Sequence, residues 1–173
     1  MTPDPRKDRR REGPATPAPM LRRAARYLGA LLLVGVGTIH LHEYLANYYR
    51  VIPVIGPLFL ANFVVAIALA LLIAAPVELL GRPGHSLLRL LALGAMGFAA
   101  TTIVGLAISE ASTLFGFHEH GYRTTIQLSL AFEGAVILLF ALFLGLELST
   151  PTARAERVGA APGRMSQLPA AQR

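Results

Sequence analysis

The chain has 173 residues, of which 54% are apolar and 15% are charged, and it contains no cysteine. Soluble proteins average roughly 45–50% apolar and about 25% charged residues, so the composition indicates a membrane protein rather than an ordinary soluble domain. The lack of cysteine excludes disulfides, thiolate metal sites and cysteine nucleophiles.

The first 22 residues are rich in arginine and proline and contain no apolar run. Such a segment cannot bury enough surface to offset the entropy of ordering, so we predict that residues 1–22 form a disordered basic tail. Residues 150–173 are predicted to be a second disordered tail for the same reason. The net charge of +6 lies mainly beside apolar segments, so we expect the N-terminal tail to contact anionic lipid and not nucleic acid.

Residues 23–149 hold four apolar segments, at about 26–44, 58–80, 87–109 and 125–148. Each is close to the ~20 residues that a helix needs to cross about 30 Å of hydrocarbon. Proline and glycine interrupt the chain before the second and third segments. The first segment has a basic start, but it continues without a cleavage site, so we expect it to remain as a span. The predicted fold is therefore all-α: a four-helix transmembrane bundle.

The placement of positive charge predicts the orientation of this bundle. Fourteen of the sixteen lysines and arginines lie in the two tails, near their junctions with the spans, or around the turn between the second and third segments. Arg50 and Arg123 are the other two. Because cytoplasmic loops carry the excess of Lys and Arg, both termini are predicted to be cytoplasmic.

This topology gathers polar side chains in the outer half of the bundle. His40 and Glu43 share one face of the first span, Asn62 lies about one turn into the second, and Glu133 lies about two turns into the fourth. Ionisable groups within a span cost roughly several kcal/mol unless they face the bundle interior and find partners. We therefore predict an intramembrane polar cluster of His40, Glu43, Asn62 and Glu133.

Three interpretations of this cluster remain open. The first is structural, with polar side chains that hydrogen-bond between helices and fix the bundle. The second is a metal ion or haem, because imidazole and carboxylate groups are good ligands, although no metal-binding spacing supports it. The third is a proton or small-solute path that uses His40 and Glu133 as titrating relays. The predicted metal ligands are His40, Glu110, His118 and His120.

Small residues recur every four positions along the third span, at Gly97, Thr101, Gly105 and Ser109. Such a stripe lets two helices approach closely. We predict that it packs against another helix of the same bundle. Homo-dimerisation, or contact with another membrane protein, is the alternative.

The stretch from His40-Leu41 through Tyr49 to Asn62 carries the pattern H-L…Y-x-x-I-P-x-I-G-x-L-F-L-x-N. It resembles small, uncharacterised four-span bacterial membrane proteins, and the match covers about a quarter of the chain. The resemblance implies the same topology and no particular activity.

Signatures of common enzymes, such as a P-loop, a nucleophile elbow or a dinucleotide fingerprint, are absent from the sequence. We therefore expect a non-enzymatic, multi-pass protein of the bacterial cytoplasmic membrane, structural or accessory in role. A metal- or haem-binding redox accessory protein and a small proton-linked transporter are the alternatives.

Overall fold

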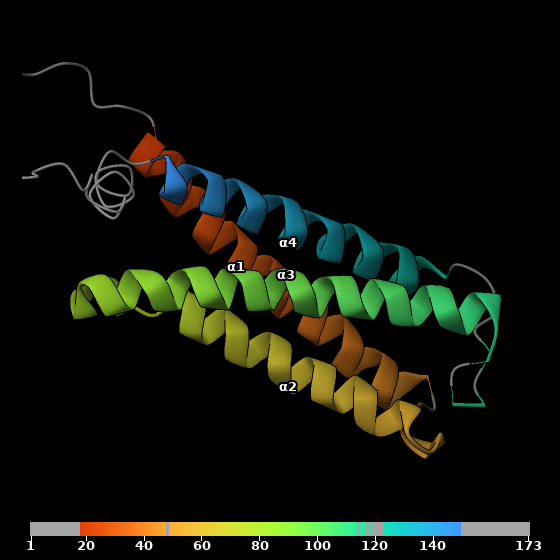
Figure 1. Cartoon of the computed structure of the whole chain (residues 1–173). Helices are drawn as coiled ribbons and strands as arrows, with labels where there is room; N and C mark the ends of the chain where they lie inside the picture. The colour runs from red at the N-terminus through yellow and green to blue at the C-terminus, as the bar shows by residue number, and fades with distance from the viewer. Residues whose placement is uncertain (1–17, 48, 114, 117, 119–122, 150–173) are drawn as a thin grey trace, which may run out of the picture.

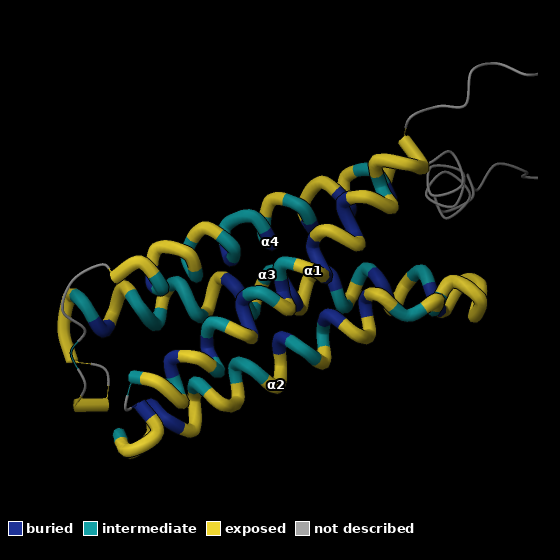
Figure 2. Tube along the Cα trace, turned by 180° about the vertical axis from the view of Figure 1, so that it is seen from behind, coloured by how far each residue is buried: buried dark blue, intermediate teal, exposed yellow. Residues whose placement is uncertain are grey.

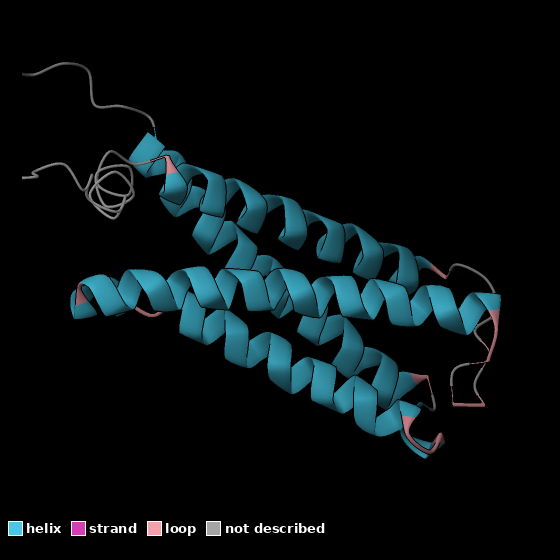
Figure 3. Ribbon diagram, viewed as in Figure 1, coloured by secondary structure: helices cyan, strands magenta, loops and turns pink. Residues whose placement is uncertain are grey.

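The computed structural model describes residues 18–47, 49–113, 115–116, 118 and 123–149. This part of the chain is all-α and contains no strand (Figure 3). It holds four long helices: α1 (Ala18–Ala46), α2 (Ile55–Ala74), α3 (Arg82–Ala111) and α4 (Thr124–Leu148). Each is long and apolar enough to cross a membrane, so the protein has four candidate spans. Two short 3-10 helices, η2 (Tyr49–Val51) and η3 (Val77–Leu80), follow α1 and α2.

Several helix boundaries differ from the sequence-based expectation, and two of them differ most. Helix α1 begins at Ala18, so the last residues assigned to the N-terminal tail are helical. Helix α2 ends at Ala74 rather than at residue 80, because Pro76 forces the preceding residue into an extended conformation and η3 follows. The remaining residues of the two predicted tails lie outside the described residues.

The turn between η3 and α3 depends on two glycines. Gly81 has a φ of 69°, a conformation that side chains with a Cβ rarely adopt. A Cβ atom at Gly84 would lie 1.9 Å from the carbonyl oxygen of Val77. The two glycines therefore let α3 begin directly against η3.

Helix α1 packs extensively against both α2 and α4, whereas α2 and α3 contact each other least among neighbouring helices. Figure 1 shows the start of α1, the α2–α3 connection and the end of α4 together at one end of the bundle. We call this the basic end, because Arg22, Arg26 and Arg89 lie there. The opposite end, where α1 leads into η2 and α4 begins, is the cavity end. From the basic end, α2 and α3 diverge towards the cavity end (Figure 1).

Glycines on α1 bring it close to its neighbours. A Cβ atom would lie 2.8 Å from the Phe140 ring if it were added at Gly29, and 2.6 Å from the Phe132 ring if added at Gly35. At Gly37 it would lie 3.2 Å from a side chain of α2. These contacts surround a core with almost no exposed surface. Figure 2 shows exposed residues along all four long helices, and many large apolar residues are among the exposed ones, as a lipid-facing surface requires.

Among the described residues, the small-residue stripe on α3 does not mediate close packing against another helix of the bundle, so that prediction is wrong. A Cβ atom at Gly97 or Gly105 would meet no heavy atom within 4 Å, and Thr101 is exposed. Only Ser109 is buried. The stripe fails because its spacing does not determine which face of the helix meets a neighbour. The buried face of α3 consists mostly of other small residues, notably Ala92, Ala95 and Ala99, together with Leu88.

Candidate functional site

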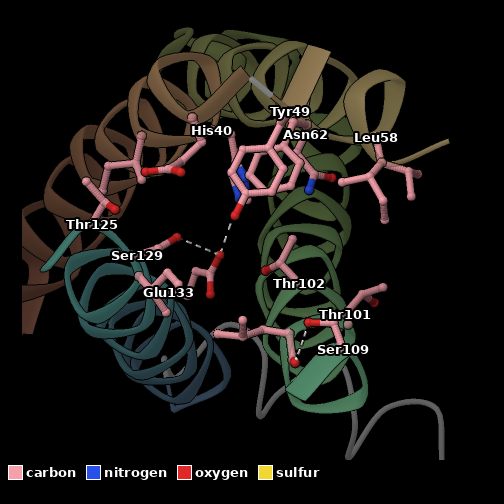
Figure 4. A pocket seen from close by; sticks show the side chains of 17 residues that line it. His40, Tyr49, Leu58, Asn62, Thr101, Thr102, Ser109, Thr125, Ser129 and Glu133 are labelled. Carbon is pink, nitrogen blue, oxygen red and sulfur yellow. Dashed lines mark hydrogen bonds and ion pairs between the residues drawn. The ribbon is translucent and has the colours of Figure 1, made fainter. Parts of the chain in front are cut away.

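A cavity of about 290 Å³ lies between the four long helices at the cavity end (Figure 4). Its apolar lining comes mainly from Ile39, Ile55, Leu58, Phe59, Leu106 and Ile126. Every long helix also contributes polar side chains. These are His40, Glu43, Asn62, Thr101, Thr102, Ser109, Thr125, Ser129 and Glu133. All four residues of the predicted polar cluster therefore line one cavity, together with three residues of the small-residue stripe.

His40 of α1 and Glu133 of α4 face each other across this cavity (Figure 4). The His40 Nε2 atom lies 3.5 Å from the Glu133 Oε1 atom, and the two residues are only 8% and 3% exposed. Ser129 donates a hydrogen bond of 3.2 Å to the same Glu133 oxygen. Neither ring nitrogen of His40 has a hydrogen-bond partner among the described residues. Burial of an imidazole without such partners is energetically costly.

Glu43, one turn after His40 on α1, lies at the rim of the cavity. Its Oε2 atom accepts a hydrogen bond of 2.9 Å from Asn47 and lies 3.4 Å from a guanidinium nitrogen of Arg123. Arg123 also donates to the Tyr49 hydroxyl at 2.5 Å. The Glu43 Oε1 atom, in contrast, is buried and has no hydrogen-bond partner in the described part of the chain. One oxygen of Glu43 is thus engaged at the rim while the other is not.

The sequence-based analysis interpreted Arg123 only as a topology charge and did not single out Phe59. Phe59 places the edge of its ring against His40 at 5.3 Å and stacks on Tyr49 at 4.6 Å between ring centroids. A signal for Arg123 was present, since it is one of two arginines on the same predicted side as Glu43. The aromatic pair has no comparable signal, because an apolar span contains many such rings.

The predicted metal ligands are not assembled by the described residues. The His118 ring forms a hydrogen bond of 2.9 Å with the carbonyl oxygen of Ser112, and Glu110 is half-buried on α3 outside the cavity lining. His120 lies outside the described residues. No group of three histidine or carboxylate side chains that could hold a metal ion occurs in residues that the structure describes. A haem held by two imidazoles would need a second histidine, and the described cavity lining contains only His40.

The basic end contains a second set of buried charges, which the sequence analysis counted only as orientation signals or passed over. Arg26 of α1 is 2% exposed and donates to the carbonyl oxygens of Ile73 at 2.7 Å and Ala75 at 2.6 Å. It also pairs with Glu78 of η3. The guanidinium therefore lies on the C-terminal end of α2, where carbonyl groups lack helical partners and the helix dipole is negative.

Glu147 of α4 is the second buried charge at the basic end that has several partners. Its carboxylate lies 2.7 Å from Arg22, 3.1 Å from the His85 ring and 3.7 Å from Arg89. It thus connects α4 with α1 and α3, while Arg26 connects α1 with α2. His85 is half-exposed and takes part in this network.

Neither a family model, nor a curated protein, nor a solved structure matches the chain.

Proposed function

We propose that the chain is a non-enzymatic, multi-pass membrane protein that binds a small amphipathic molecule in the cavity between its four helices. The observation that carries this proposal is the cavity itself, with a buried His40–Glu133 pair whose imidazole has no hydrogen-bond partner among the described residues. Its volume of about 290 Å³ is near the lower end of small-molecule sites. Mixed apolar and polar walls suit a ligand that has both kinds of surface.

The proposed setting is a bacterial cytoplasmic membrane with both termini in the cytoplasm. The distribution of lysine and arginine supports this orientation, since only Arg50 and Arg123 lie towards the cavity end. The cavity would then lie in the outer half of the bilayer. The basic end, and an arginine-rich tail in contact with anionic lipid, would lie on the cytoplasmic side.

A binding role fits the molecule better than a proton path. Helix α1 has no titratable residue between Tyr27 and His40, and α4 has none between Glu133 and Glu147. Helix α2 has no titratable residue from Ile55 to Ala74, and α3 has none between Arg89 and Glu110. The core between the two ends is fully buried and apolar. A relay of protons needs titratable groups or water at short intervals, and this middle layer offers no titratable side chain.

The proposal can be tested with three probes of one shape and different charge: benzylamine, benzyl alcohol and benzoate. Saturation-transfer NMR on the full chain in nanodiscs measures their binding, with empty nanodiscs as the blank for lipid partitioning. We expect at least one probe to bind the wild-type protein. A Gly105→Phe substitution should abolish that binding, because a side chain at this position fills the cavity.

Gly145→Phe is the matched control. Gly145 lies on α4 near the basic end, and a Cβ atom there would also meet no heavy atom within 4 Å. This variant should fold and bind like the wild type. If no probe distinguishes the Gly105 variant from the Gly145 variant, the cavity is not a binding site and the proposal is wrong.

A redox accessory role makes a separate prediction. Such a protein, purified from its membrane, would show a haem absorption band or a stoichiometric metal ion, and the signal would disappear in His40→Ala. We expect a featureless visible spectrum and no stoichiometric metal, because the described residues supply a single histidine to the cavity.

A further inference from the structure

The hydroxyl groups that line the cavity offer lone pairs rather than protons. Thr101 donates its hydroxyl proton to the carbonyl oxygen of Gly97 at 2.8 Å. Thr102 does the same towards the carbonyl of Ala99, and Ser109 towards that of Leu106, both at 2.8 Å. A hydroxyl has one proton and two lone pairs. Each of these side chains has therefore used its donor within α3 and retains acceptor capacity only.

The α4 wall has the same character. Ser129 donates its proton to Glu133, so its oxygen too retains only acceptor capacity. The Glu133 carboxylate is acceptor-only when ionised, and the Oε1 atom of Glu43 is a buried acceptor without a hydrogen-bond partner in the described chain. The other donors in the lining are the Asn62 amide, one N–H of the His40 ring and the hydroxyl groups of Tyr49 and Thr125. Acceptors therefore outnumber donors in the lining, and the fixed charges among the lining side chains are negative.

The lining also has a large apolar part and an opening towards the lipid. Phe59 and Ile55 of α2 and Leu106 of α3 form apolar walls. Leu58 of α2 and Thr101 of α3 line the cavity and are exposed. They belong to the two helices that diverge from the basic end (Figure 1). A ligand can thus enter laterally, between α2 and α3, from within the membrane.

We infer that the ligand class of this cavity is a small lipophilic organic ammonium ion. This inference rests on the proposed function, since it names the ligand class of the same site. The ammonium group supplies the N–H donors and the positive charge that Glu133 and the neighbouring hydroxyl oxygens lack. Its apolar part packs against Phe59 and Leu106. Partition into lipid brings such an amine to the opening between α2 and α3.

A bare metal ion fits these walls less well. Calcium and magnesium ions require six or more oxygen ligands at close range, and transition metals favour several imidazole or carboxylate groups. The cavity lining offers His40, Glu43 and Glu133, but the described residues include no cluster of three such groups at metal-binding range. Much of the remaining wall is apolar and would leave an inorganic ion without its hydration shell.

The three one-ring probes test the inference at neutral pH, where benzylamine is protonated. We expect benzylamine to bind at least about tenfold more tightly than benzyl alcohol, and benzoate not to bind, because one charge-assisted hydrogen bond in a buried site contributes about this factor. Glu133→Gln should remove the advantage of the amine over the alcohol. Glu78→Gln, which changes a carboxylate at the basic end outside the cavity, should preserve it.

A second variant protects the test if Glu133→Gln fails to fold. Thr102→Val keeps the shape of the side chain and removes one acceptor, so it should weaken benzylamine binding and leave benzyl alcohol unaffected. Equal binding of amine and alcohol would overturn the ligand class while leaving the cavity a binding site. Binding of none of the three probes would overturn the proposed function as well. Displacement of benzylamine by calcium chloride at matched ionic strength would indicate an inorganic cation site and also overturn the inference.

Discussion

Replacement of Arg26 by alanine should destabilise the bundle more than any other single loss of charge at the basic end. The guanidinium donates two hydrogen bonds to carbonyl oxygens at the end of α2, and the residue is only 2% exposed. A hydrogen bond from a charged donor contributes about 1.5–3 kcal/mol. The pair with Glu78 adds at most about 1 kcal/mol, because that carboxylate is 40% exposed and stays hydrated without its partner.

The expected loss is therefore about 3–5 kcal/mol, most of it from the two carbonyl groups of Ile73 and Ala75 that would be left without a donor. For a chain of this size, such a loss corresponds to a fall in melting temperature of about 6–20 °C. Arg26→Lys should lie between the wild type and Arg26→Ala, because a single ammonium group cannot reproduce the planar fork of the guanidinium.

The assay is the fraction of monodisperse protein that remains on size-exclusion chromatography after heating in detergent. Arg23→Ala is the matched control: Arg23 lies on the same turn of α1 but is exposed, so its loss should change stability by no more than about 0.5 kcal/mol. Equal melting temperatures for Arg26→Ala and Arg23→Ala would refute the assignment of Arg26 as the group that ties α1 to the end of α2.

Two further predictions concern packing and orientation. Gly29→Leu should lower the melting temperature, with a cost of about 1–3 kcal/mol, because its Cβ atom would lie 2.8 Å from the Phe140 ring, whereas Gly145→Leu should match the wild type in the same heating assay. A periplasm-specific reporter should stay dark when fused after Leu148 and be bright when inserted after Arg50; the reverse pattern would contradict the proposed orientation.

The four helices could be predicted from the sequence because hydropathy over about 20 residues is a strong and local signal. Their ends could not be placed as well. Helix α1 begins at Ala18, within a basic segment whose composition predicts a solvated tail. The change from α2 to η3 depends on the restricted backbone before Pro76, a local effect within an otherwise continuous apolar run.

The polar cluster illustrates a different limit. Hydropathy and charge place His40 and Glu133 at the same depth, but only the order of helices around the bundle decides whether they meet. The 3.5 Å separation follows from the packing of α1 against α4. Arg26 was missed as part of a site because an arginine near the end of a span serves equally well as an orientation signal. Glu147 was passed over because it lies at the end of the last span, where a charge needs no partner inside the bundle. Their burial depends on neighbours that are distant in the sequence.

Among the described residues, the basic end has one buried side-chain atom without a hydrogen-bond partner, the Arg89 Nε atom, whereas His40 and Glu43 at the cavity end have three such atoms. At the basic end, Arg26 connects α1 with the end of α2 and with η3, and Glu147 connects α4 with α1 and α3. At the cavity end, α2 and α3 have diverged, and His40 and Glu43 retain buried atoms without hydrogen-bond partners in the described chain. Collapse of the cavity would bury these atoms further at a cost, whereas a donor-rich ligand would satisfy them. The ion pairs and hydrogen bonds at the basic end can therefore stabilise a bundle whose other end keeps a cavity with unpaired polar atoms. The binding of a ligand in that cavity should raise the stability of the protein.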